Sequence, residues 1–174
     1  MPIGGWNAMP PLRQAGNIVC NEIIKMTNKE FKDTLDKLLK PHGFKKKGNE
    51  WTAETNELVK TIDLQKSNFS NLYYLNYGYN FKDLDYNGTK HHINNRLGSL
   101  DTEVNKLIQD TFDLENSIDD LTRTKNLIEL INNALLPEVN STNNKADIMD
   151  SLETRLTLND IPLRVKEFLN IKTE

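Results

Sequence analysis

Residues 73–81 have the sequence YYLNYGYNF, in which five aromatic or apolar residues occupy every second position. A β-strand turns successive side chains to opposite faces of its sheet, so a period of two indicates a strand with one buried face. Aromatic residues at this spacing favour a strand over a helix. The pattern predicts a strand whose core-facing side chains are Tyr73, Leu75, Tyr77, Tyr79 and Phe81.

Further strands on both sides of this segment are predicted to complete an antiparallel sheet from about Trp51 to Leu97. The strand before it has Leu58, Ile62 and Leu64 on one face and more polar residues on the other. Polar turn sequences separate the strands, at residues 54–57, 67–71 and 85–89. The predicted strands comprise residues 51–53, 58–66, 73–81 and 91–97.

An amphipathic helix is predicted to precede the sheet. Thr27 and Glu30 have the spacing of a capping box, which marks a helix N-terminus. Pro41 and Gly43 end the helix, and the lysines at 45–47 are expected to form a solvated turn. The apolar stripe of the helix consists of Phe31, Leu35, Leu38 and Leu39.

The chain after the sheet is predicted to be mainly helical. Apolar residues recur at helical spacing over residues 100–112, with a strand over residues 106–114 as the alternative. Asp119 and Asp120 suit the start of the next helix, because acidic residues are favourable near a helix N-terminus. That helix is expected to end at Pro137.

Two shorter helices are expected near the C-terminus. Asp160 is predicted to cap the last one, with Pro162 just inside it. Short strands followed by helices are typical of an α+β fold, here an antiparallel sheet of about four strands with helices packed on one face. The helix before the last is predicted from Ile148, Met149, Leu152 and Leu156.

The composition indicates an ordinary globular protein. The chain has 174 residues, is 37% hydrophobic and carries a net charge of −3, which argues against a general binder of nucleic acid or anionic membranes. Residues 1–25 are predicted to form an irregular or flexible arm and residues 26–174 a single domain; alternatively, Met26 is the natural start. Cys20 is the only cysteine, which excludes a disulfide-stapled scaffold. With no secretory signal pattern and no apolar run of membrane-spanning length, we expect a cytoplasmic protein.

The sheet face opposite the aromatic residues is the candidate binding face. It receives polar side chains from the second, third and fourth predicted strands. Such a strip suits a polar ligand or a partner protein. The alternative is an ordinary solvated face, which antiparallel sheets commonly have. The candidate residues are Asp63, Gln65, Tyr74, Asn76, His92, Asn94 and Arg96.

No motif for catalysis, cofactor binding or metal binding occurs in the sequence. There is no G-x-S-x-G segment and no glycine-rich phosphate loop, so no cofactor is predicted. His91 and His92 point to opposite faces of the predicted strand and no third ligand stands at useful spacing, so no metal site is predicted. Cys20, the one thiol, lies in the N-terminal arm.

The order of several short motifs resembles a bacterial protein family. After the amphipathic helix come GFKKKGNEW (43–51), IDLQKS (62–67), the aromatic strand, HHINNRLGSL (91–100) and ALLP (134–137). In this order the chain is similar to the domain of unknown function 4304, over residues 26–156 or so. That family has no established activity, so the resemblance implies a fold, and its small acidic members are similar in style to immunity proteins that neutralise bacterial toxins. The family pattern often has a second basic residue two places before the arginine matched by Arg96; here that residue is Asn94, which argues against an arginine pair for an anion.

These observations favour a non-enzymatic protein-binding module of the immunity or defence-linked type, located in a bacterial cytoplasm. Its expected partner is another protein, such as a toxin. The alternative is a small-ligand-binding protein or enzyme that uses the polar sheet face around His92 and Arg96, which predicts that these side chains converge in a concave pocket. A third hypothesis, nucleic-acid binding through the lysines at 45–47, predicts a contiguous basic patch.

Overall fold

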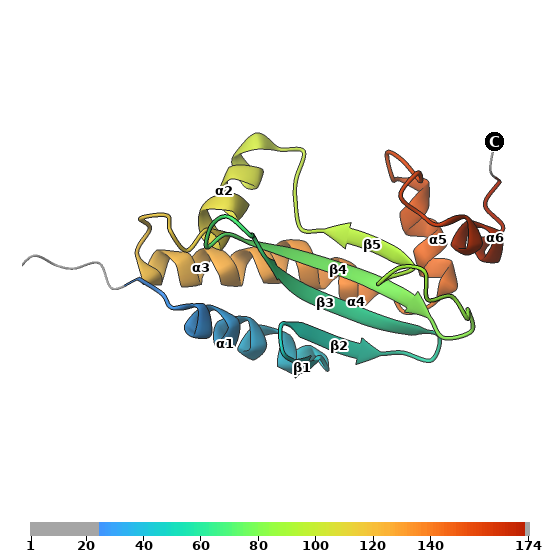
Figure 1. Cartoon of the computed structure of the whole chain (residues 1–174), viewed down its shortest axis with the longest axis horizontal. Helices are drawn as coiled ribbons and strands as arrows, with labels where there is room; N and C mark the ends of the chain where they lie inside the picture. Colours follow the sequence, from blue (N-terminus) through green and yellow to red (C-terminus); the bar gives the residue numbers. More distant parts are fainter. Residues whose placement is uncertain (1–24, 173–174) are drawn as a thin grey trace, which may run out of the picture.

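The computed structural model describes residues 25–172, which form a layer of antiparallel strands and a layer of helices. Helices α3 (Asp120–Leu130) and α4 (Leu136–Ser141) lie behind the sheet in Figure 1, so the other face of the sheet is turned toward the viewer. The predicted α+β class is confirmed. Apart from Lys25, the predicted N-terminal arm lies outside the described residues, and so does Cys20.

The sheet contains five strands in sequence order, each antiparallel to its neighbours. The prediction missed the first of them, because three consecutive lysines have little intrinsic strand preference. A turn at Gly48, where φ is +66°, folds these lysines back to pair with the second strand. The strands are β1 (Lys45–Lys47), β2 (Glu50–Glu54), β3 (Leu58–Lys66), β4 (Tyr73–Phe81) and β5 (Ile93–Arg96).

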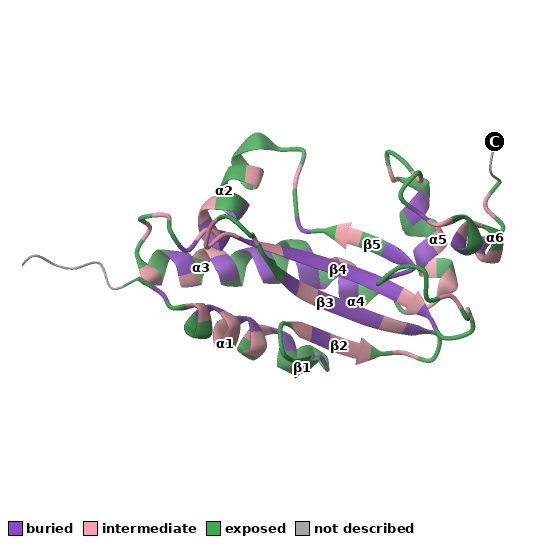
Figure 2. Cartoon of the chain, in the orientation of Figure 1, coloured by how far each residue is buried: buried purple, intermediate pink, exposed green. Residues whose placement is uncertain are grey.

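The aromatic face of β4 is buried against the helices, as predicted. The Tyr77 hydroxyl donates a hydrogen bond to Glu138 on α4 at 2.7 Å, which joins the two layers. Figure 2 shows the buried residues as bands along β3 and β4. Burial of each such side chain contributes about 1.5–3 kcal/mol, so this face is a main source of stability. The buried residues of the face are Tyr73, Leu75, Tyr77, Tyr79 and Phe81.

Lys60 also lies on the buried face of β3. Its ammonium donates to the Val139 carbonyl at 2.6 Å and to Asn143 Oδ1 at 2.9 Å, near the C-terminal end of α4. A positive charge is favourable there because it offsets the helix dipole. Burial lowers the pKa of the Lys60 amine. The alternation of β3 therefore holds even where the inward side chain is charged.

Helix α1 (Asn28–Leu39) begins at the predicted capping box. The Glu30 amide donates to Thr27 Oγ1 at 3.2 Å, and the Thr27 amide donates to the Glu30 carboxylate at 2.8 Å. Phe31 stacks on Tyr73 with ring centroids 5.6 Å apart, which ties α1 to β4. The helix ends in a short 3-10 turn, η1 (Lys40–His42), and in Gly43 at φ +83°, as the sequence predicts.

Residues after the sheet are mainly helical, with one correction to the boundaries of the first two predicted helices. Helix α2 (Thr102–Phe112) covers residues 106–112 of the segment for which a strand was the alternative, and beyond it Asp113 forms an isolated antiparallel bridge with Leu72. Asp119 caps α3 as expected, but the helix does not end at Pro137. A π-helical turn, η2 (Ile131–Leu135), joins α3 to α4. Its wider turn makes room for a proline ring at the start of α4, where the missing N–H leaves no helical bond unmade.

The C-terminal helices are α5 (Lys145–Glu153) and α6 (Leu163–Leu169). The predicted cap at Asp160 is wrong: Pro162 occupies the cap position, and the Asp160 carboxylate accepts from Arg155 at 2.6 Å. Leu156 lies beyond α5 and is exposed rather than part of its apolar stripe. In the part of the chain from residue 25 to residue 172, no helix has both the length and the apolar character that a bilayer crossing requires.

Candidate functional site

Six of the seven candidate residues lie on the sheet face opposite α3 and α4. The register sets Asp63 opposite Asn76 on β4, and Asn76 opposite Arg96 on β5. Facing residues of paired strands project to the same side, so the alternation of each strand brings the rest to this surface. We call this surface the polar face; it consists of Asp63, Gln65, Tyr74, Asn76, Asn94 and Arg96.

His92 is the exception, and its predicted place on the polar face is wrong. The regular strand begins only at Ile93, so the alternation does not extend back to His92. The His92 ring is buried and stacks on Phe81 with centroids 5.9 Å apart. Its Nδ1 accepts a hydrogen bond from the Phe81 amide at 2.9 Å, so Nε2 carries the proton and donates to the Tyr86 carbonyl at 2.9 Å. His92 therefore fastens the loop before β5 to the end of β4.

His91 takes the place on the polar side that was predicted for His92. Its ring lies over Gly78: a Cβ atom at that glycine would come within 2.6 Å of His91 Cγ. Only glycine leaves the room that this ring occupies. The signal available in the sequence was the glycine in a strand of aromatic residues, since a strand glycine often marks a close approach.

The His91 ring is buried but unpaired. The residue is 5% exposed, and neither ring nitrogen has a hydrogen-bond partner among the described residues. Asp63 Oδ2 lies 3.9 Å from His91 Nε2, which is beyond hydrogen-bond distance. Burial lowers the pKa of His91, the Lys90 ammonium lowers it further, and the carboxylates of Asp63 and Glu50 oppose this shift. A buried polar ring without a partner is costly, so the surroundings of His91 are the candidate site.

The polar hollow is a cavity of about 390 Å³ that His91 lines. It opens on the polar face, with the remaining walls supplied by the loop before β5 and by Asp160. Four residues predicted from the strand pattern converge here with three loop residues that the pattern missed. The members that carry hydrogen-bonding side chains from the sheet and loop are Asp63, Gln65, Asn76, Thr89, Lys90, His91 and Asn94.

Charges at the polar hollow are paired within the protein. The Lys90 ammonium lies 2.7 Å from Asp63 and 3.1 Å from Glu50. On the far side, Arg155 binds Asp160 at 2.6 Å and also donates to the Asn94 carbonyl at 2.9 Å. The groups left for a bound molecule are therefore mainly neutral donors and acceptors.

Arg96 is held across the polar face by its neighbours. Its Nε donates to Asn76 Oδ1 at 2.9 Å, and one terminal nitrogen donates to Gln65 Oε1 at 3.3 Å. The guanidinium also lies 4.6 Å from the centroid of the Tyr74 ring, a cation–π distance. The network fixes Arg96 at the border between the polar hollow and a second cavity.

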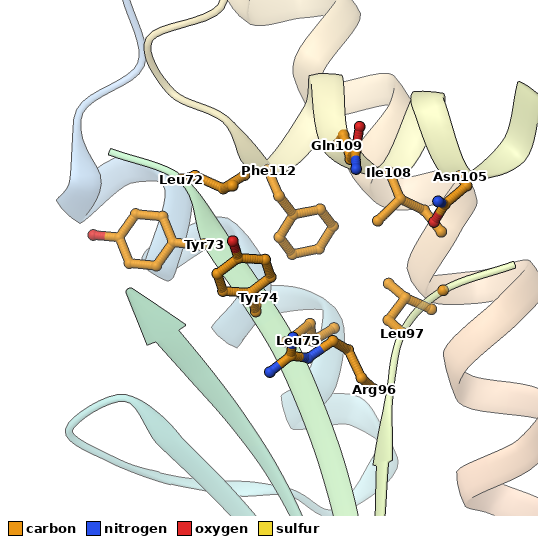
Figure 3. Close-up of a pocket in the computed structure, with 11 residues that line it drawn as sticks. Leu72, Tyr73, Tyr74, Leu75, Arg96, Leu97, Asn105, Ile108, Gln109 and Phe112 are labelled. Carbon is orange, nitrogen blue, oxygen red and sulfur yellow. The ribbon is translucent and has the colours of Figure 1, made fainter. Parts of the chain in front are cut away.

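The second cavity lies between α2 and the ends of β4 and β5, and we call it the α2 hollow (Figure 3). Its volume is about 250 Å³. Figure 3 shows apolar side chains from the sheet and from α2 around it, with Arg96 and Tyr74 on the sheet side. The side chains that define it are Tyr74, Leu75, Arg96, Leu97, Ile108 and Phe112.

The three lysines of β1 do not form one basic patch. Adjacent strand residues face opposite sides, so Lys46 projects away from its two neighbours. The Lys46 ammonium lies 5.5 Å over the Trp51 ring and 3.6 Å from Asp33. The geometry gives no support to the nucleic-acid hypothesis, which required a contiguous patch.

A metal site also lacks support in the geometry. Among residues 25–172, no group of three His, Cys, Asp or Glu side chains lies close enough to hold an ion. His91 and His92 point into different surroundings, one over Gly78 and the other against Phe81.

Comparisons with known proteins identify a family but no characterised relative. No curated protein and no solved structure matches the chain. A family model matches residues 35–141, which include the five strands, the whole lining of the α2 hollow, the lining of the polar hollow except Asp160, and the helices from the end of α1 to α4. This is more than half of the chain, and it lies inside the region over which the sequence motifs resemble that family. The chain belongs to the family described as domain of unknown function (DUF4304).

Proposed function

We propose that the protein binds a small, uncharged polar ligand in the polar hollow. The observation that carries this proposal is His91, a buried ring that lines the polar hollow and whose two nitrogens have no hydrogen-bond partner among the described residues. A neutral imidazole offers one donor and one acceptor, which suits a ligand group that can both donate and accept, such as a hydroxyl or an amide.

The lining of the polar hollow supports an uncharged ligand over an ion. Lys90 is already bound by Asp63 and Glu50, and Arg155 by Asp160. A charged ligand would have to compete with these pairs, whereas a neutral one can use the side-chain amide of Asn94 and the amide hydrogens that Asn76 and Gln65 do not use in the network with Arg96. The expected ligand therefore carries several hydroxyl or amide groups and no net charge.

The arrangement supports binding rather than catalysis. Nucleophilic catalysis needs a hydroxyl or thiol beside a base. Of the described residues that line the polar hollow, Thr89 alone has a hydroxyl, and it donates to the His91 carbonyl rather than to a ring nitrogen. His91 and Asp63 are also too far apart to share a proton directly.

A titration followed by NMR tests this proposal. Uncharged probes such as glucose, inositol and acetamide are added to the labelled protein, with glucuronate and glucosamine as charged counterparts. We expect saturable shifts confined to the amides of Gly78, His91 and Asn94, larger for the uncharged probes. His91→Gln should weaken binding, whereas His42→Gln, at an exposed site on η1, should not. Failure of a broad set of uncharged probes to bind, or equal loss in both variants, would contradict the proposal.

A protein partner is the second candidate, because Phe69 at the β3–β4 turn is 99% exposed. Aromatic residues, phenylalanine among them, are enriched in the cores of protein interfaces. In this case the partner would be a protein such as a toxin, and the chain an immunity or defence-linked factor of a bacterial cytoplasm. The single cysteine supports that location.

Affinity capture with a matched variant tests this second candidate. The wild-type protein and Phe69→Ser are used as baits, with Leu163→Ser on α6 as the control for loss of an exposed apolar side chain. We expect Phe69→Ser alone to lose the partner. A partner retained by all three baits would show that the turn is not the interface.

A further inference from the structure

The α2 hollow has the chemical character of a binding site that differs from the polar hollow. Leu75 and Leu97 contribute apolar surface from the sheet, and Ile108 and Phe112 contribute it from α2. All four are nearly fully buried, so the walls are set by the packed core rather than by mobile surface side chains. Figure 3 shows Phe112 and Ile108 on one side of the space and Leu97 on another.

One charge borders these apolar walls. Of the described residues that line the α2 hollow, Arg96 is the only charged one. Its guanidinium is oriented by Asn76 and Gln65, neither of which is ionised, and no carboxylate of residues 25–172 forms an ion pair with it. A preformed, uncompensated guanidinium beside an apolar cavity favours a carboxylate.

The volume limits the size of the occupant. A cavity of about 250 Å³ is larger than the roughly 150 Å³ apolar cavities that hold a single benzene ring, and it is smaller than most drug-sized sites. One aromatic ring or a short hydrocarbon chain fits, with little room for more.

We propose that the α2 hollow binds a small molecule with an apolar body, such as one aromatic ring, and a single carboxylate that pairs with Arg96. The apolar body packs between Leu97 and Ile108 while the carboxylate stays near the Tyr74 side of the cavity. This site is separate from the uncharged-ligand site proposed for the polar hollow, and neither depends on the other being occupied.

The test compares phenylacetate with phenylacetamide, which have the same shape but differ in charge. Each is titrated into the labelled full-length protein, and the amides of Leu97, Gly98 and Ile108 are followed by NMR. We expect phenylacetate to bind at least about fivefold more tightly than phenylacetamide, and the difference to shrink as salt is raised. Equal affinity for the two probes, or binding of neither, would overturn the proposal. Shifts confined to Gly78 and His91 would place the probe in the polar hollow and would overturn it as well.

Charge variants on α2 sharpen the test without touching the core. Gln109 lines the cavity from an exposed position on α2. Gln109→Lys should strengthen phenylacetate binding and Gln109→Glu should weaken it, each by about threefold, with phenylacetamide binding unchanged. Lys106→Gln makes the same change in net charge as Gln109→Glu but lies outside the lining, so it should have little effect. Equal effects of Gln109→Glu and Lys106→Gln would refute a local ion pair.

Removal of the guanidinium is the final variant. Arg96→Gln keeps a group able to reach Asn76 but removes the charge, and it should reduce phenylacetate affinity to that of phenylacetamide. Since Arg96 is largely exposed, the fold should survive, which circular dichroism checks. Retained preference for the carboxylate in Arg96→Gln would contradict the assignment.

Discussion

Gly78→Ala tests whether the close approach of His91 to β4 is built into the fold. An added Cβ would lie 2.6 Å from His91 Cγ and 2.6 Å from the Ile93 carbonyl oxygen. The ring is buried and the carbonyl belongs to the neighbouring strand, so neither can move away cheaply. Overpacking of this kind costs about 1–3 kcal/mol, and we take the upper end because the added Cβ clashes with two groups, the ring and the carbonyl. A gain of about 0.4–1 kcal/mol from a less flexible unfolded chain offsets part of this.

We therefore expect Gly78→Ala to lower the free energy of unfolding by about 2 kcal/mol, measured by urea denaturation followed by circular dichroism. Gly98→Ala is the matched control, because its Cβ would meet no atom closer than 3.9 Å. That variant should stay within about 0.5 kcal/mol of the wild type. The double variant Gly78→Ala/His91→Ala should lose less than the two single losses added together, since the clash with the ring is then absent. A loss in Gly78→Ala no larger than in Gly98→Ala would refute the reasoning.

Three further outcomes follow from the structure. Arg123→Met should lower the free energy of unfolding by about 3 kcal/mol in urea denaturation, because the buried guanidinium donates to four backbone carbonyls. These belong to Asp110, Thr111, Asp113 and Asn116. The control Arg164→Met, at an exposed site, should change the free energy of unfolding by less than about 0.5 kcal/mol. Burial lowers the pKa of folded His91 below the unfolded value of about 6.5, so the unfolded chain takes up the proton first. The neutral His91 ring therefore contributes to stability above about pH 6.5, and this contribution is lost as the pH falls below that value. Between pH 7 and 5, the free energy of unfolding should fall less in His91→Gln than in the wild type, as measured by urea denaturation at each pH. Equal decreases in the two proteins would contradict this expectation. Asn144→Ala should cost about 1 kcal/mol in thermal unfolding, since Asn144 accepts from the Asp147 amide at the start of α5.

Elements governed by local pattern were predicted well. The capping box at Thr27 involves atoms three residues apart, and the alternation of Tyr73–Phe81 is a property of one strand. Asp119 as a cap belongs to the same class. Each of these features depends on neighbours in the chain, so the sequence carries the needed information.

Features that depend on distant partners were missed or misplaced. Three lysines form β1 only because β2 pairs with them, and Pro137 continues a helix only because a π-helical turn precedes it. No sequence pattern indicates that Arg123 is buried and bound to backbone carbonyls, because these contacts form only when the C-terminal end of α2 packs against α3.

The polar face shows the same division. Strand alternation along the chain sufficed to predict that Asp63, Asn76 and Arg96 share a surface opposite the aromatic core. The sequence pattern does not decide which of the two adjacent histidines joins this surface, because that depends on where the pairing of β5 with β4 stops. His92 instead stays in the core, where it forms hydrogen bonds with the Phe81 amide and the Tyr86 carbonyl. The cavities themselves form where the sheet meets the loop before β5 and helix α2, so their shape follows from packing between segments. Local periodicity assigns a side chain to a face, and only the assembled fold decides what lies beside it.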